Sequence, residues 1–208
     1  GAEATEASIK VARRYFYSIG KPNKNRILCV KNSFHGRTIA AIFASGSKKM
    51  VEGFGPKVPG FDHFIFGDHK SLKKNITKNT KVILPVHMFG NPCKMSKIKS
   101  IAKKFKLKVI EDACLATGAE YENKKIGCLS DCSVFSTNPG KILDGIGPGG
   151  IITTNNKDLY NKLLQLRDYG RRERPKKWPV NSYMVGYNSK MSTINAAVLN
   201  IRLKKLND

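Results

Sequence analysis

Residues 109–113 read Val-Ile-Glu-Asp-Ala, an apolar run that ends in two carboxylates. A short run of this kind predicts a buried strand of a parallel sheet, with its polar residues at the carboxyl end. A second strand is predicted over residues 132–137 (CSVFST), and it leads into the turn Asn-Pro-Gly at residues 138–140. Lys141 follows that turn and precedes the glycine-rich residues 145–150 (GIGPGG).

The pattern therefore presents three chemical groups in the order Asp112, Ser136, Lys141. A lysine in a loop between β elements can form a Schiff base, an aspartate can hold a pyridinium nitrogen, and a serine can bind a phosphate. Pyridoxal phosphate needs these three anchors. Each residue alone is more often a solvated lysine, a turn-capping carboxylate or a strand-end hydroxyl. Together and in this order they favour a cofactor bound covalently through Lys141.

The rest of the chain alternates helix and strand, which predicts an α/β fold of three layers with a mostly parallel central sheet. One continuous sheet is favoured over two domains. Helices are expected over residues 5–19, 39–44, 98–105, 158–167 and, as an amphipathic helix, 192–206; further strands are expected over residues 26–30, 81–86, 107–111 and 150–154. Irregular surface is expected over residues 45–69, a polar hairpin over 120–127, and a mobile loop over 171–177.

The chain of 208 residues has a formal net charge of +23, which invites a nucleic-acid interpretation. The excess is mostly lysine and is dispersed, and aromatic residues are not interleaved with it as stacking on bases requires. Nucleic acid is therefore not an expected partner, and the charge instead favours encounter with anionic phosphorylated ligands. No apolar run of about 18 residues predicts a membrane span.

The five cysteines have irregular spacing and lack the nearby histidines of a zinc site, so no metal is expected. Free, buried thiols are typical of a cytoplasmic protein.

Several motifs in the second part of the chain occur together in order. They are residues 83–90 (ILPVHMFG), 109–113 (VIEDA), 118–121 (GAEY), Phe135-Ser136 leading to Lys141, Gly149-Gly150, and residues 186–189 (GYNS). With these motifs, residues 81–208 resemble the sugar aminotransferases of the DegT/DnrJ/EryC1/StrS family, which are pyridoxal-phosphate enzymes of fold type I.

This resemblance implies a role for each matching residue. Lys141 would form the Schiff base, Asp112 would pair with the pyridine nitrogen, and Ser136 would bind the phosphate. Asn188 would reach the phosphate of a neighbouring subunit, which implies a homodimer with shared active sites. The family usually has Gln or His where Leu115 stands, so a hydrogen bond to the cofactor's phenolic oxygen is expected to be missing.

Residues 1–68 are similar to a second group. Residues 1–6 (GAEATE), 34–38 (FHGRT) and 60–63 (GFDH) resemble the class III aminotransferases, closest to acetylornithine aminotransferase. By that likeness the backbone of Gly1 and Ala2 would hold phosphate at a helix N-terminus. Phe34 would stack on the cofactor ring, and Arg37 would bind a substrate carboxylate.

We therefore expect one cofactor-binding large domain over residues 1–208, cut at both ends, with a join between the two family-like parts near residues 66–84. The C-terminal small domain of such enzymes is expected to be missing. The function expected first is transfer of an amino group from an amino-acid donor to a nucleotide-linked keto sugar, in sugar biosynthesis. The alternatives are an acetylornithine or ω-amino-acid aminotransferase, and an inactive basic fragment.

Overall fold

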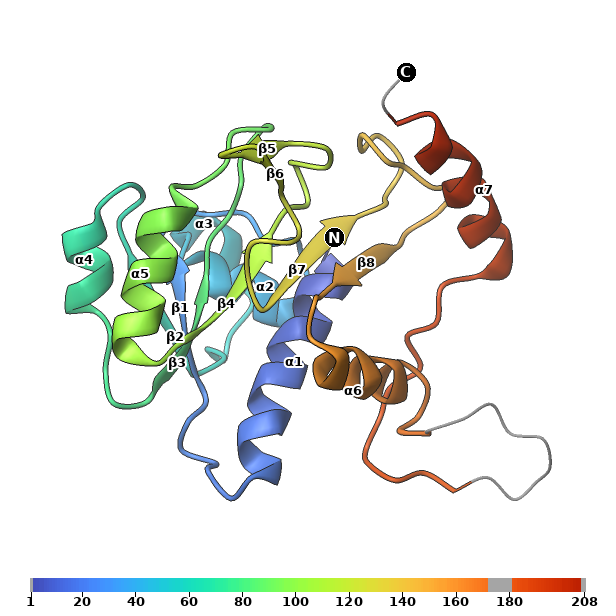
Figure 1. Cartoon of the computed structure of the whole chain (residues 1–208). Coiled ribbons are helices and arrows are strands. Elements are labelled where there is room, and N and C mark those ends of the chain that lie inside the picture. The colour runs from blue at the N-terminus through green and yellow to red at the C-terminus, as the bar shows by residue number, and fades with distance from the viewer. Residues whose placement is uncertain (1, 172–180, 207–208) are drawn as a thin grey trace.

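The structure is a computed structural model, and it describes residues 2–171 and 181–206 (Figure 1). Its centre is a six-stranded sheet with the strand order β2-β1-β3-β4-β7-β8. The strands are β1 (Arg26–Val30), β2 (Phe61–Phe64), β3 (Thr80–Leu84), β4 (Lys108–Asp112), β7 (Cys132–Ser136) and β8 (Gly150–Thr153). All neighbours pair in parallel except β8, which runs antiparallel to β7. The prediction of a mostly parallel sheet is confirmed.

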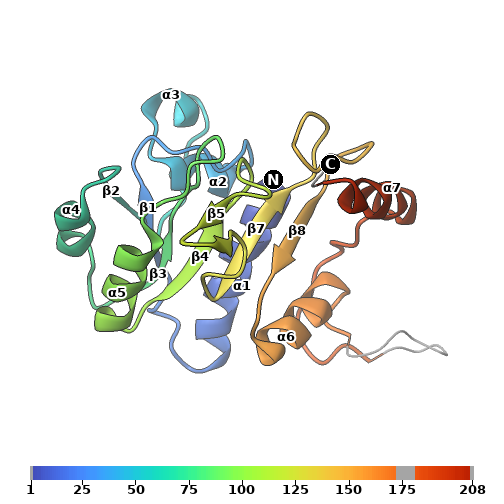
Figure 2. The same cartoon turned by 45° about the horizontal axis from the view of Figure 1, so that its top comes forward.

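Helices cover both faces of this sheet (Figures 1 and 2). The described helices are α1 (Ala2–Ser18), α2 (Ile39–Ser45), α3 (Lys48–Val51), α4 (His69–Lys74), α5 (Met95–Phe105), α6 (Lys157–Arg167) and α7 (Thr193–Lys204), of which α7 lies beyond the β8 edge. Successive strand residues point to opposite faces. Ile27 and Cys29 of β1 therefore join the buried cluster under α1 and α2, whereas Leu28 and Val30 join the cluster under α4 and α5. The three-layer prediction is confirmed.

Two local predictions were wrong. Residues 45–69 are not uniformly irregular, because they contain α3 and the edge strand β2. In β2 only Phe61 and Phe64 are buried, and four residues are too few to show a periodic pattern. The helix near the C-terminal end is not amphipathic towards the core, because α7 buries Asn195 and Leu199 and exposes Ile194.

Other local predictions hold. The polar hairpin is β5 (Glu120–Tyr121) paired with β6 (Lys124–Lys125). The loop expected at residues 171–177 lies outside the described residues, apart from Arg171. Among the described helices, none is long and apolar enough to cross a membrane.

Parallel strands bring their carboxyl ends to one edge of the sheet, where α/β proteins bind their ligands. Here that edge gathers the loops that follow β1, β3, β4 and β7. These loops contain the sequence-predicted residues Phe34, Arg37 and Lys141, and Asp112 and Ser136 are the last residues of β4 and β7.

Candidate active site

Asp112 is fully buried at the end of β4 and has a histidine as its main partner. The distance from Nδ1 of His35 to Oδ2 of Asp112 is 2.7 Å, and the backbone N–H of Cys114 donates to Oδ1 at 3.2 Å. Burial alone would raise the pKa of Asp112. The hydrogen bond and charge of His35, helped by Cys114, outweigh burial and hold that pKa below its ordinary value. Asp112 is therefore ionised.

The hydrogen bonds of Ser33 determine the charge of His35. The single hydroxyl proton of Ser33 is donated to the carbonyl oxygen of Val30 at 2.7 Å. Ser33 Oγ can then only accept from Nε2 of His35, which is 2.9 Å away. Because Nδ1 faces an ionised carboxylate, both ring nitrogens carry protons. His35 is a buried cation paired with Asp112.

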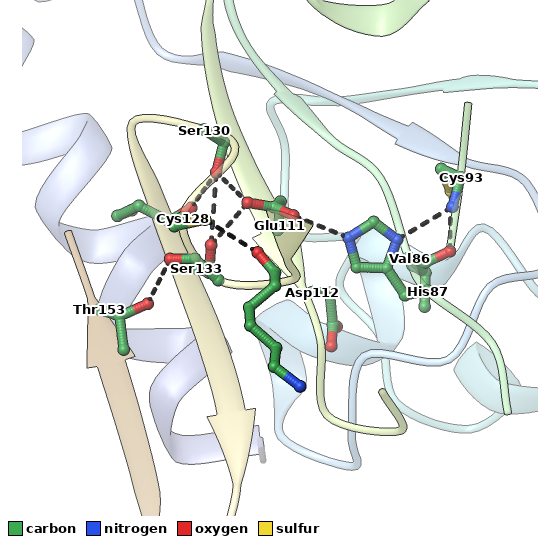
Figure 3. Close-up of polar contacts among 12 residues, drawn as sticks. Val86, His87, Cys93, Glu111, Asp112, Cys128, Ser130, Ser133 and Thr153 are labelled. Atoms are coloured by element: carbon green, nitrogen blue, oxygen red, sulfur yellow. Dashed lines mark hydrogen bonds and ion pairs between the residues drawn. The ribbon is translucent and has the colours of Figure 1, made fainter. Parts of the chain in front are cut away.

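Glu111, the residue before Asp112, points to the opposite face of β4 and has its own network (Figure 3). Its Oε1 accepts from Ser130 Oγ at 2.7 Å and from Ser133 Oγ at 2.8 Å, and its Oε2 lies 3.0 Å from His87 Nε2. The backbone N–H of Cys93 donates to His87 Nδ1 at 3.1 Å, so that nitrogen has no proton and the ring is neutral. This network joins the loop after β3 to β4 and β7.

Lys141 lies in the loop between β7 and β8, and its backbone N–H donates to Asn138 O at 3.1 Å. Its ammonium group interacts electrostatically with Cys114. Burial raises the pKa of the Cys114 thiol, as does the charge of Asp112, and the charge of Lys141 acts in the opposite direction. The backbone N–H of the same Cys114 donates to Asp112, so the charge of Lys141 acts on the residue that contacts Asp112.

Ser136 is buried beside the start of α1. In the β7–β8 pair it lies opposite Gly150, where an added Cβ would come within 2.7 Å of Cβ of Ala4. Gly36 allows a similar approach, because a Cβ there would lie 2.4 Å from Cβ of Ala2. Glycine therefore lets the N-terminal turn of α1 approach the β7–β8 pair at Gly150 and the loop after β1 at Gly36.

Two fully buried hydroxyls belong to this same region. Thr5 is in the first turns of α1 and Thr137 follows Ser136, and within the described residues neither Oγ1 has a hydrogen-bond partner. A buried hydroxyl without a partner costs free energy. Together with the free N–H groups and positive dipole of a helix N-terminus, these donors suit an anionic group such as a phosphate. The chemistry around Ser136, Thr137 and the start of α1 therefore fits the phosphate that was predicted to bind Ser136.

The remaining sequence-predicted residues are less closely joined to this centre. Phe34 and Arg37 form an exposed pair, with the guanidinium carbon 5.7 Å from the ring centroid. Asn188 is exposed and forms an isolated antiparallel β-bridge with Asp168. Among the described residues, no hydrogen bond connects it to Ser136 or Lys141. Leu115 is partly buried, and Gly1 lies outside the described residues.

The pairing of His35 with Asp112 was not predicted from the sequence, in which His35 is only the residue after Phe34. The signal was present, since a histidine directly after Phe34 lies in a loop that follows a strand. Its partner Asp112 is 77 residues away, and only the order of strands in the sheet brings the two together.

The model of the DegT/DnrJ/EryC1/StrS aminotransferase family matches residues 61–208. The chain belongs to this family. The model of the class III aminotransferases matches residues 1–101, so the two matched ranges overlap over residues 61–101. His35 and Asp112 therefore lie in parts of the chain that different family models match.

Two curated relatives illustrate both likenesses. A dTDP-3-amino-3,6-dideoxy-alpha-D-galactopyranose transaminase from Aneurinibacillus thermoaerophilus is 34% identical over 208 residues, which cover 100% of this chain and 53% of the relative. An acetylornithine aminotransferase from Agrobacterium fabrum is 47% identical over 116 residues, which cover 55% of this chain and 27% of that protein. The chain thus spans about half the length, or less, of these relatives.

Two solved structures share the fold over nearly the whole chain. The Helicobacter pylori aminotransferase PseC, involved in the biosynthesis of pseudoaminic acid, has 25% identity and a TM-score of 0.76, with 98% of this chain and 52% of that chain covered. NtdA from Bacillus subtilis with bound cofactor PMP has 29% identity and a TM-score of 0.73, with 99% and 42% covered. The fold is that of the fold type I aminotransferases.

Proposed function

We propose that this chain is the cofactor-binding part of a pyridoxal-phosphate-dependent aminotransferase, with Lys141 as the residue that carries the cofactor. The observation that supports this most is the buried, ionised Asp112, which is paired with His35 and lies at the sheet edge where the loop of Lys141 also begins. Bound pyridoxal phosphate supplies an electron sink for a substrate carbanion.

Each residue then has a defined task. Asp112, ionised among buried neighbours, favours a protonated pyridine nitrogen. Ser136, with the N-terminal turn of α1 and the hydroxyls of Thr5 and Thr137, would bind the phosphate. Lys141, when its amine is free, is the base that moves a proton to and from the substrate's α-carbon.

The other predicted positions complete the binding site. Phe34 follows β1 beside His35 and would lie against the cofactor ring, with Arg37 available for a substrate carboxylate through a bidentate contact. Gly1 and Ala2 would add backbone N–H groups for the phosphate. The aliphatic Leu115 offers no hydrogen bond to the phenolic oxygen of the cofactor.

For the substrates, we infer an amino-acid donor and a nucleotide-linked keto sugar as acceptor. The family match over residues 61–208 and relatives named as dTDP-sugar transaminases support this choice. The class III match over residues 1–101, which includes Arg37, supports acetylornithine or another ω-amine as the second candidate. Turnover of acetylornithine without turnover of keto sugars would favour the second candidate.

We also propose a homodimer with shared active sites in the cytoplasm. Large apolar side chains are exposed on the Lys141 loop and on α7: Ile142, Ile146, Ile194, Ile201 and Leu203. A second copy of the chain would cover this surface and could bring Asn188 to the partner's phosphate site. Five free cysteines agree with a cytoplasmic location. Sedimentation of Ile201→Asp should show monomers where the unmodified protein forms dimers.

The decisive experiment for the function is to trap the cofactor on Lys141. The full-length protein is incubated with pyridoxal phosphate, reduced with borohydride and digested, and the labelled peptide is identified by mass spectrometry. We expect the label on Lys141 and its loss in Lys141→Ala. The chain has many lysines, so Lys157→Ala, a change at an exposed lysine of α6, is the matched control and should keep the label. A label that persists unchanged in Lys141→Ala contradicts the proposal.

A further inference from the structure

The loop that carries Lys141 is held from outside by α7. Oδ1 of Asn195 accepts the backbone N–H of Ile146 at 3.0 Å. Arg202 lies about two turns after Asn195 on α7. It forms an ion pair with Asp144 and donates to the backbone carbonyl oxygen of Asp144 at 2.8 Å. The other carboxylate oxygen of Asp144 accepts the N–H of Gly140 at 3.2 Å. Both contacts from α7 therefore reach the loop after Lys141, and Asp144 passes the second one on to Gly140, just before Lys141.

The hydrogen bonds within the loop do not include the N–H of Ile146 or the carbonyl oxygen of Asp144, which α7 contacts. Internal bonds run from Lys141 N to Asn138 O at 3.1 Å, from Gly145 N to Thr137 O at 2.8 Å, and from Gly149 N to Asn138 Oδ1 at 3.2 Å. The N–H of Ile146 is satisfied by α7 directly. Without Asn195, the backbone at Ile146 would lose its direct hydrogen bond to α7, and the Arg202–Asp144 contact alone would join this segment to the helix.

Packing alone does not explain an asparagine at position 195. Its side chain is 3% exposed, whereas Ile194 and Ile201 on the same helix are 70% and 62% exposed. Burial by apolar area would favour the reverse arrangement. The loop also leaves space for the amide, because a Cβ on Gly145 would lie 2.0 Å from Oδ1 of Asn195, and one on Gly149 would lie 3.2 Å from Nδ2.

We propose that Asn195 is a positioning residue for Lys141, with the Arg202–Asp144 pair as a second, weaker anchor of the same loop. The inference rests on the proposed function, because it takes Lys141 as the group that carries the cofactor. A reacting amine must be held close to its productive geometry, and a lysine on a loop depends on the residues that fix that loop. Asn195 supplies this support by holding the backbone at Ile146.

The test compares two ligands in the full-length protein. Pyridoxal phosphate can be attached to Lys141, whereas pyridoxamine phosphate carries an amine in place of the aldehyde and binds only non-covalently. Asn195→Leu keeps the size of the side chain and removes the acceptor. We expect it to slow attachment at Lys141 by about tenfold, the effect of one hydrogen bond, and to leave pyridoxamine phosphate affinity within about twofold. Asn195→Asp keeps an acceptor and should restore the rate.

The matched control is Asn200→Leu, the same change at an exposed position of α7, which should leave both ligands unaffected. If Asn195→Leu attaches cofactor at the rate of the unmodified protein, the inference is wrong. Equal losses of attachment and of pyridoxamine phosphate affinity would also overturn it, since they indicate a general structural role. If Asn195→Leu does not fold, Arg202→Met takes its place in the same comparison. Attachment at Lys141 should then slow by less than tenfold, and the same two outcomes would overturn the inference. Failure of the unmodified protein to attach cofactor at Lys141 would instead overturn the proposed function itself.

Discussion

Glu111 and Asp112 are neighbours on β4, both buried, and each has a histidine partner, yet they face opposite sides of the sheet (Figure 3). Burial would raise the pKa of each carboxyl, but hydrogen bonds outweigh it and lower both. The difference lies in the histidines. His87 accepts a backbone N–H and is neutral, whereas His35 donates from both ring nitrogens and is charged.

This difference agrees with the roles proposed for the two carboxylates, a structural one for Glu111 and cofactor binding for Asp112. Glu111 is enclosed by Ser130, Ser133 and His87, and these contacts hold the loop after β3 to β4 and β7. Asp112 lies at the edge that gathers the loops of Phe34 and Lys141, and the charge of His35 keeps it ionised. The two adjacent carboxylates therefore have different surroundings, because the loop after β1 supplies His35 to Asp112 and the loop after β3 supplies His87 to Glu111.

The largest effect is expected from Glu111→Ala on stability. The substitution leaves two buried donors, on Ser133 and His87, without this acceptor, whereas Ser130 Oγ still lies 2.8 Å from the carbonyl oxygen of Cys132. Each buried polar group left without a partner costs about 1–3 kcal/mol, so the free energy of unfolding should fall by about 2–6 kcal/mol. Urea unfolding monitored by circular dichroism measures it. Ser133→Ala removes a single donor and should cost about 1 kcal/mol. A loss below that of Ser133→Ala would show that the Glu111 network does not stabilise the fold.

A smaller but more specific effect is expected from Asp112→Asn on cofactor binding. The amide preserves the shape and removes the charge that holds a protonated pyridine nitrogen. A hydrogen bond between charged groups is worth about 1.5–3 kcal/mol, so the affinity for pyridoxal phosphate should fall by about ten- to a hundredfold. Equilibrium dialysis measures it. Glu111→Gln, the same change on the other face, should leave the affinity within about threefold, and equal losses in both variants would remove the distinction drawn here.

The order of motifs was enough to predict most of the fold, whereas the roles of Asp112, Ser136 and Lys141 stay predictions. Asp112 and Ser136 end strands with clear apolar runs, and both strands were predicted to within one or two residues. Contacts between distant segments could not be predicted. The pairing of His35 with Asp112 depends on β1 and β4 lying on either side of β3, and the burial of Asn195 contradicts the apolar pattern of α7.

The smallest effect on pyridoxal phosphate binding at neutral pH is expected from His35→Gln, which should instead shift the pH dependence of binding in one direction. Asp112 has a lowered pKa in the folded protein. Its ionised form therefore stabilises the fold above the ordinary carboxyl pKa of about 3.9, and this stabilisation is lost as the pH falls through the lowered pKa. Glutamine removes the charge of His35, and burial then raises the pKa of Asp112. The acid limb of pyridoxal phosphate binding should therefore move to higher pH, with little change near pH 8. His87→Gln changes a histidine on the other face and should leave that limb in place. Identical shifts in the two variants would mean that His35 acts on Asp112 no more than any buried histidine near the sheet edge does.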